Sequence, residues 1–280
     1  MIKIIADTLS SIPVEEAKQL GLAYLPQIII FGEESFRDDY EIDADTFIER
    51  LKSSPILPKT AAPYPHLYQP ILDVITKNKD EILIICPSSK ISGTYSRAVV
   101  AAQDYPDAKI TILNMPILGA GLGSIVRTAV KLASQGKTVV EIGKIVTEMA
   151  SRNRTYFLVD TLEYLQKGGR IGAAKALLGS VLQVKPILGI ADGEVKAVES
   201  QRTRKKALER FIELVTSECP RTEAAFLSVQ HGGALEEAKA LQKTLSEKTG
   251  IQNIPITNLP PAILVHAGPG ILGVSFFLDQ

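Results

Sequence analysis

Short apolar runs alternate with longer amphipathic segments through the first half of the chain. This alternation is typical of a parallel sheet whose strands are joined by crossover helices. The predicted strands are residues 2–6, 25–31, 81–86, 109–113 and 155–159, and the predicted helices are residues 14–20, 45–51, 67–76, 96–103 and 123–135. The pattern therefore predicts an α/β fold that begins with a doubly wound parallel sheet.

The pattern changes after about residue 160. Asp192 and Gly193 stand between an apolar run and an alternating run, which is a hairpin signal that a strictly parallel sheet does not need. Further predicted elements are helices at 203–217 and 234–248, a strand at 224–230, and an apolar strand, turn and strand at 263–278. We therefore predict two domains, an α/β domain over residues 1–160 and an α+β domain with a mixed or mainly antiparallel sheet over residues 161–280.

Composition narrows the classes of function. The chain of 280 residues has 31 Lys and Arg against 31 Asp and Glu, and this balance argues against nucleic acid or an anionic membrane as the main partner. Two cysteines and three histidines argue against a disulfide scaffold and a Cys/His metal cluster. No segment has the pattern of a signal peptide or of a membrane span. These features predict a cytoplasmic protein without a metal and with at most transient membrane contact.

A serine-rich loop is the first candidate for chemistry. Residues 87–96 (PSSKISGTYS) follow a predicted strand and lead into a predicted helix. In open α/β sheets, ligands gather beyond the carboxyl ends of the strands, where a helix N-terminus offers unpaired N–H groups to an anion. Ser92 and its neighbours suit a carboxylate or phosphate, and the competing interpretation is a helix cap with solvated serines. The loop lacks the P-loop ending and the Gly-x-Gly-x-x-Gly pattern, so nucleotide binding loses support.

Other candidate residues each have two interpretations. Thr60 lies in a long Pro-rich loop and is either a hydroxyl donor or a turn former. Arg170 follows two glycines that end a short predicted helix, and it either holds an anion or lies on the surface. His266 precedes Gly-Pro-Gly in an apolar segment, where it either donates to an anion or is a satisfied core residue. His66 and His231 are predicted to be surface residues.

Five motifs in this order resemble the DegV family. They are Asp7-Thr8, Lys59-Thr60-Ala61-Ala62-Pro63, Ser88-Ser89-x-x-Ser92-Gly93-Thr94-Tyr95, Asp160-Thr161-Leu162-x-Tyr164-Leu165-x-Lys167-Gly168-Gly169-Arg170-Ile171 and His266-x-Gly268-Pro269-Gly270. The resemblance implies a two-domain α/β protein that holds one long-chain fatty acid, such as palmitate, in a tunnel between the domains. It also implies a binding subunit of bacterial fatty acid kinase, whose separate ATP-binding subunit makes an acyl phosphate for phospholipid synthesis.

The resemblance also implies roles for individual residues. Thr60, Ser92 and His266 match the residues that bind the carboxylate, and Arg170 matches the supporting polar network, with Ala61 and Gly93 beside them. The chain departs from the family at two places, with Ala61-Ala62 where Ser-Gln is common and with Asn114-Met115 where an Asp-Ser pair is common. The backbone N–H of Ala61 is retained, so the first departure bears on partner contact more than on carboxylate binding.

The main expectation is a binding protein without cofactor and without chemistry of its own. The alternatives are a serine-dependent acyl hydrolase with Ser92, His266 and Asp7, a phosphosugar enzyme that uses the serine-rich loop, and a regulatory module with a structural lipid. The hydrolase requires His266 within hydrogen-bond reach of Ser92, and the chain has no Gly-x-Ser-x-Gly elbow. Arg202 and Arg204 belong to a basic cluster that is either a solvated helix face or a docking surface for the kinase subunit.

Overall fold

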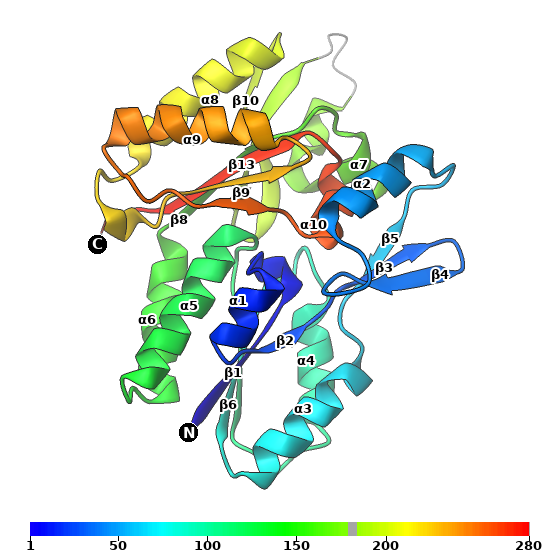
Figure 1. Ribbon diagram of the computed structural model, residues 1–280, viewed down its shortest axis with the longest axis vertical. Helices are drawn as coiled ribbons and strands as arrows, with labels where there is room; N and C mark the ends of the chain where they lie inside the picture. Colours follow the sequence, from blue (N-terminus) through cyan, green and yellow to red (C-terminus); the bar gives the residue numbers. More distant parts are fainter. Residues whose placement is uncertain (179–183, 280) are drawn as a thin grey trace.

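Figure 1 shows the computed structural model, which describes residues 1–178 and 184–279. The described residues form three sheets, of four, six and three strands. The four-stranded sheet and its helices fill the lower half of the view, and the six-stranded sheet and its helices fill the upper half (Figure 1). Within the described ranges, no helix is long and apolar enough to cross a membrane.

The first sheet is parallel throughout and is covered on both faces. Its order is β2-β1-β6-β7, and its neighbouring strands all pair in parallel. The strands are β1 (Ile2–Asp7), β2 (Ala23–Leu25), β6 (Glu81–Cys86) and β7 (Ile110–Asn114). Side chains of β6 are buried on both faces, which explains its continuous apolar sequence. The predicted doubly wound parallel sheet is confirmed.

Helices cover the two faces of this sheet. On one face Tyr68 and Leu72 of α3 pack with Ala98 of α4, and on the other face lie α1, α5 and α6. Their bounds are α1 (Val14–Gln19), α3 (Pro65–Lys77), α4 (Thr94–Ala102), α5 (Ala120–Ser134) and α6 (Val139–Ser151). The sequence pattern did not predict α6, although Thr138 and Glu141 form a capping box at its start.

A small antiparallel sheet, at the right of Figure 1, replaces part of one predicted strand. Its order is β4-β3-β5, with β3 (Ile28–Phe31), β4 (Glu34–Arg37) and β5 (Lys59–Ala61), and α2 (Ala44–Ser53) connects β4 to β5. The single strand predicted at 25–31 is therefore wrong. Pro26 has no N–H for a sheet ladder, and the N–H of Gln27 donates to Thr8 Oγ1 and Asp38 Oδ1 instead.

The second sheet is mixed. Its order is β10-β9-β8-β13-β11-β12, in which β11 and β12 pair in parallel and the other neighbours are antiparallel. Its strands are β8 (Asn153–Leu158), β9 (Lys185–Ala191), β10 (Glu194–Gln201), β11 (Ser228–Gly232), β12 (Ile256–Asn258) and β13 (Ile271–Phe277). Asp192 and Gly193 have φ of +53° and +77°, as a tight hairpin turn requires. The mixed sheet and the hairpin are confirmed.

Two predictions for this half are wrong. The strand predicted at 155–159 for the first sheet is β8 and lies within the second sheet, where it pairs with β9 and β13. Residues 263–267 are helical because Pro261 starts α10 (Pro261–Ala267) at a position suited to proline, and Gly268 ends it with φ of +76°. The division of the chain at residue 160 stays a prediction, although the strand before it already belongs to the second sheet.

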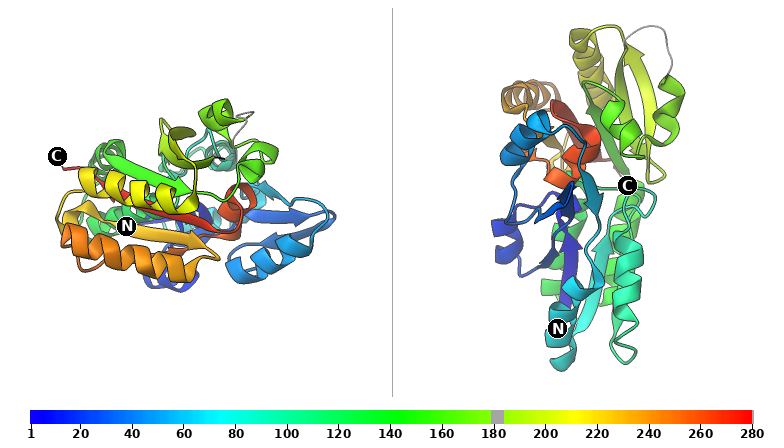
Figure 2. Two further views of the ribbon diagram at one scale, coloured as in Figure 1. Left: turned by 90° about the horizontal axis from the view of Figure 1, so that it is seen from above. Right: turned by 90° about the vertical axis from the view of Figure 1, so that its right-hand side faces the viewer.

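The other helices pack around the second sheet. Figure 2 shows α8 and α9 lying side by side over one face of it. The helices are α7 (Glu163–Lys167), α8 (Arg204–Glu218) and α9 (Leu235–Thr249), and short 3₁₀ helices span Thr8–Ser10, Gly172–Leu177 and Glu223–Ala225. The opposite face of the sheet is turned toward α10 and the first sheet, and a cavity lies there.

Candidate functional site

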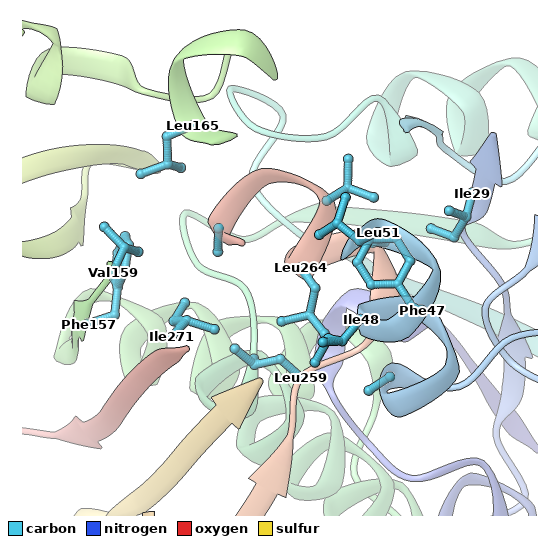
Figure 3. Packing of buried hydrophobic residues seen from close by; sticks show 14 of the residues in the cluster. Ile29, Phe47, Ile48, Leu51, Phe157, Val159, Leu165, Leu259, Leu264 and Ile271 are labelled. Atoms are coloured by element: carbon cyan, nitrogen blue, oxygen red, sulfur yellow. The ribbon is translucent and has the colours of Figure 1, made fainter. Parts of the chain in front are cut away.

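The cavity opens between the two large sheets and α10. It encloses about 890 Å³ of space, its mouth included. Its walls are mainly apolar and include Leu9, Ile91, Leu165, Ile190, Val195 and Leu259. Figure 3 shows the packing of buried apolar residues that include part of these walls, with Phe157 and Ile271 close together, Leu165 above them and Leu259 to their right. An apolar cavity with a few polar groups is the usual form of a small-molecule site.

Two of the predicted residues form a direct hydrogen bond at one end of this cavity. Thr60 on β5 and His266 on α10 both line it, and Thr60 Oγ1 lies 2.9 Å from His266 Nε2. These residues are separated by 206 positions in the chain. With the proton on Nε2, the imidazole donates to Thr60 and leaves the hydroxyl hydrogen of Thr60 free for a ligand.

His266 is held as a neutral ring. Burial and, as the smaller cause, the positive charge of Arg170 together lower its pKa to about 4. Gly168, two residues before Arg170, leaves room for the ring, because a Cβ at Gly168 would lie 2.2 Å from His266 Nδ1. Gly168 also ends α7, as the two glycines of the motif predicted. The Gly-Gly-Arg sequence therefore serves the histidine as well as the helix end.

Ser92 connects the cavity to a buried polar network. Its hydroxyl lies 3.0 Å from Thr94 Oγ1, at the start of α4. Thr94 Oγ1 in turn lies 2.7 Å from Asp7 Oδ2, and Gln27 Nε2 donates to the same carboxyl oxygen at 2.6 Å. The serine-rich loop thus combines a helix N-terminus with a hydroxyl chain that leads to a carboxyl group.

That network contains two buried carboxyl groups. Burial raises the pKa of Asp7 to about 7 and the pKa of Asp38 to about 8. Hydrogen bonds oppose burial at both groups, from Thr94 to Asp7 and from Thr8 to Asp38. Near neutral pH a substantial fraction of each carboxyl is protonated, so negative charge beside the cavity stays low.

Arg170 lines the same cavity without being fully buried. Its Nε donates to the carbonyl oxygen of Ile91 at 3.1 Å, and its Nη1 donates to that of Gly168 at 2.8 Å. It therefore joins the serine loop to the glycines beside His266. This position agrees with the supporting role that the resemblance implied and adds a positive charge at the polar end.

The structure brings most of the predicted site residues together. Thr60, Ser92, Gly93, Arg170 and His266 line one cavity. Ala61 does not line it, because alternate residues of β5 face opposite sides and Ala62 takes that place in the wall.

The structure changes the interpretation of Arg204 and of His231. Arg202 is exposed, but Arg204 donates to Asp160 Oδ1 at 3.0 Å and to Gly270 O at 2.9 Å, so it ties α8 to the start of β13. His231 is 6% exposed, so its prediction as a surface residue is wrong; it lies on β11, in the interior of the second sheet.

Sequence reasoning missed three polar residues of the cavity, Gln27, Thr155 and Gln230. All three line the cavity and are buried. Gln27 follows Pro26 in an apolar run, and Thr155 and Gln230 each stand at one end of a predicted strand, so a polar side chain beside a strand break or at a strand end is the signal that could have indicated them.

The geometry also bears on the enzymatic alternatives. The hydrogen-bond partner of His266 Nε2 is Thr60, and the partners of Ser92 Oγ are the hydroxyl and the backbone N–H of Thr94. The arrangement is therefore a set of separate donors around a cavity end and not a serine–histidine pair. Among the described residues, no three His, Cys, Asp or Glu side chains gather as they would around a metal ion.

Relatives in sequence cover the chain from end to end. A family profile, described as that of uncharacterised proteins of the DegV family, matches residues 1–279. A DegV domain-containing protein of Halalkalibacterium halodurans is 31% identical over 280 residues, covering 100% of this chain and 99% of that protein. Protein DegV of Bacillus subtilis is 32% identical and covers 98% of both chains.

Solved structures agree with these relatives. The crystal structure of DegV, a fatty acid binding protein from Bacillus subtilis, matches with a TM-score of 0.90 at 31% identity over 99% of both chains. A DegV family protein from Thermus thermophilus, described by its fatty acid binding, also matches with a TM-score of 0.90, at 25% identity over 99% of both chains. With the same fold, relatives above 30% identity along the whole chain and a profile match over residues 1–279, the chain belongs to the DegV family.

Proposed function

We propose that this protein binds one long-chain fatty acid in the cavity between its sheets. The observation that carries the proposal is a mainly apolar cavity that has the polar side chains of Thr60, Ser92 and His266 in its wall. A fatty acid has the same division, with a polar head and a long apolar chain. The fatty acid binding described for the DegV proteins of Bacillus subtilis and Thermus thermophilus supports the proposal.

The polar end suits a carboxylate by its donors and by its charge. A carboxylate that enters a protein loses water, and this is tolerable only where donors replace the lost hydrogen bonds. The hydroxyl of Thr60 and the N-terminus of α4 supply such donors, and the hydroxyl of Ser92 supplies another when a protonated Asp7 donates to Thr94 and Thr94 donates to Ser92. Arg170 adds a cation, and partial protonation of Asp7 and Asp38 limits repulsion.

We further propose that the protein has no chemistry of its own and presents the carboxylate to a separate kinase subunit. A phosphoryl donor must then reach the head group from outside. Gly93 lines the cavity beside Ser92 and is exposed to solvent, and Lys59 next to Thr60 is exposed as well. These features support a head group that lies near the surface, with Arg202 as a residue for electrostatic docking.

Extraction of the purified protein with a denaturing solvent, followed by mass spectrometry, tests the ligand. We expect about one fatty acid per chain, of roughly fourteen to eighteen carbons, because a cavity of ordinary size buries most of such a ligand. A protein that is empty and also fails to bind added palmitate, or one that carries a sugar phosphate, would contradict the proposal.

The kinase step is tested separately. The protein alone should not turn over ATP in the presence of oleate and Mg²⁺, and addition of an ATP-binding kinase subunit should produce acyl phosphate. Arg202→Glu should weaken that activity more at low salt than at high salt. Lys243→Glu, which reverses the charge of an exposed lysine on α9, is the matched control. Turnover by the chain alone, or equal effects of the two variants, would refute this part.

A further inference from the structure

The cavity contains a buried amide that the carboxylate site leaves unused. Gln230 on β11 lines the cavity and is only 3% exposed. Its Oε1 accepts a hydrogen bond of 2.7 Å from the N–H of Ala120, at the start of α5. Because a backbone N–H can only donate, this contact fixes the amide orientation and leaves Nε2 as the donor available to the cavity. Within the described ranges, no protein acceptor bonds to Nε2.

The position of this amide is maintained by a glycine. Gly119 lines the cavity beside Gln230 and has φ of +71°, a conformation that favours glycine. A Cβ at Gly119 would lie 2.5 Å from Gln230 Oε1. The backbone at Gly119 therefore lies directly against the amide of Gln230. The amide orientation is fixed by this backbone and not by a neighbouring side chain.

Sheet register places Gln230 further along the second sheet than the turn that follows α10, the helix that holds His266. Ile271, which follows the turn after α10, pairs with Gly232, and Gly273 pairs with Gln230. Side chains on one face of a strand recur every second residue, so Gln230 lies one row, roughly 7 Å, further along the wall than Ile271. Gly273, which opposes Gln230, has no side chain and leaves room for a ligand there.

An acceptor lies still further along the same wall. Thr155 lines the cavity, and its partner Ser275 is one row beyond Gly273. Asn153 Nδ2 donates to the carbonyl of Phe276, so Asn153 Oδ1 is left to accept the hydroxyl hydrogen of Thr155 at 2.9 Å. Ser275 Oγ lies 3.2 Å from Thr155 Oγ1 and then donates to one of its two lone pairs, so the other lone pair can accept a hydrogen bond from a ligand.

We propose that the cavity recognises a long-chain fatty acid with a hydroxyl group in the middle or distal part of its chain. The hydroxyl oxygen accepts from Gln230 Nε2, and its hydrogen is directed to Thr155 Oγ1. This inference rests on the proposed function and names the class of fatty acid. A plain hydrocarbon chain would cover the amide nitrogen without replacing its water, and an unpaired buried donor is costly.

The test compares stearate with 10-hydroxystearate, 12-hydroxystearate and 2-hydroxystearate by calorimetric titration of the delipidated protein. At least one of the first two hydroxy acids should bind about three- to tenfold more tightly than stearate, which is the contribution of one net hydrogen bond. Gln230→Met should remove this preference. In 2-hydroxystearate the hydroxyl lies beside the carboxylate, so its affinity relative to stearate should not depend on Gln230.

A second variant, Thr155→Val, and the binding of stearate itself separate the hydroxyl inference from the proposed function. Thr155→Val keeps the side-chain shape and should reduce the preference, so the proposal does not depend on the folding of Gln230→Met. If neither 10-hydroxystearate nor 12-hydroxystearate is preferred, or if the preference survives both substitutions, the inference is wrong while fatty acid binding stands. If neither stearate nor any hydroxy acid binds, the proposed function itself fails.

Discussion

The two faces of the second sheet are formed by the same strands, but their side chains differ in kind and in function. On the face covered by α8 and α9, Leu158, Leu272, Val274 and Phe276 are at most 1% exposed and pack into one apolar cluster. On the opposite face the neighbouring positions of β8 and β13 are Thr155, Phe157, Gly273 and Ser275. Strand geometry separates these sets, because successive side chains point to opposite sides.

This difference indicates which face serves stability and which serves a ligand. The helix-covered face is filled by large aliphatic and aromatic side chains, as a close-packed core requires. The cavity face contains a glycine, hydroxyls and the amide of Gln230, which leave space and hydrogen-bonding groups. The first sheet has helices on both faces and shows no such asymmetry.

The largest effect should come from truncating a side chain on the helix-covered face. Phe276→Ala removes a fully buried ring, and substitutions of this kind lower the free energy of unfolding by about 3 to 5 kcal/mol. Phe157→Ala is the matched change on the cavity face and should cost clearly less, because that ring borders open space. Urea unfolding of both variants measures this. Equal losses would remove the distinction between the faces.

The cavity side should also respond to pH through Asp7. Its folded-state pKa of about 7 exceeds that of an unfolded carboxyl, so the folded protein binds an extra proton and loses stability as pH rises through 7. Between pH 5 and pH 8 the unmodified protein should lose about 2 to 3 kcal/mol more than Asp7→Asn. His266, whose pKa is lowered, acts in the opposite direction below pH 6.5, but it is present in both proteins and cancels.

Urea unfolding at the two pH values measures this difference. Phe276→Ala is the control, and it should keep the pH dependence of the unmodified protein because it changes only the helix-covered face. The assignment of Asp7 would be wrong if Asp7→Asn showed the same pH dependence as the unmodified protein.

A third test separates binding from folding at the polar end. Ser92→Ala and His266→Ala should each weaken palmitate binding by about one to two factors of ten, since hydrogen bonds to charged groups contribute about 1.5 to 3 kcal/mol. The methyl ester of palmitate lacks the anion and should lose much less on either substitution. Ser96→Ala, a change of an exposed serine on α4, should alter the affinity for neither palmitate nor its methyl ester. Titration calorimetry measures the affinities, and equal losses for acid and ester would show that Ser92 only supports its loop.

The smallest effect concerns the two arginines at the start of α8. Arg204→Gln should lower the free energy of unfolding by about 1 kcal/mol, because it removes partly exposed ion pairs and a hydrogen bond to Gly270. Arg202→Gln, at an exposed position, should leave stability unchanged. Thermal unfolding distinguishes them. An unstable Arg202 variant would remove the case for Arg202 as a docking residue.

Elements whose apolar pattern is local can be predicted from the amino-acid sequence alone. The strand at 81–86 coincides with β6, the helices at 203–217 and 234–248 lie within two residues of α8 and α9, and Asp192-Gly193 forms the hairpin. Local sequence motifs also indicate Thr60, Ser92, Arg170 and His266 as candidate site residues. Period, turn chemistry and hydroxyl-rich loops are local properties, so one segment is enough to indicate them.

The sheet to which each strand belongs, and the polar groups that come into contact, depend on the folding of the whole chain. The pattern of residues 155–159 indicates a strand but not its sheet, and Pro26 divides a run that looks continuous. The contact between Thr60 and His266 joins residues 206 positions apart, and the cavity role of Gln230 depends on the start of α5. Such contacts follow from the packing of whole layers, because hydrophobic burial has no direction and gives a single segment no information about its partner.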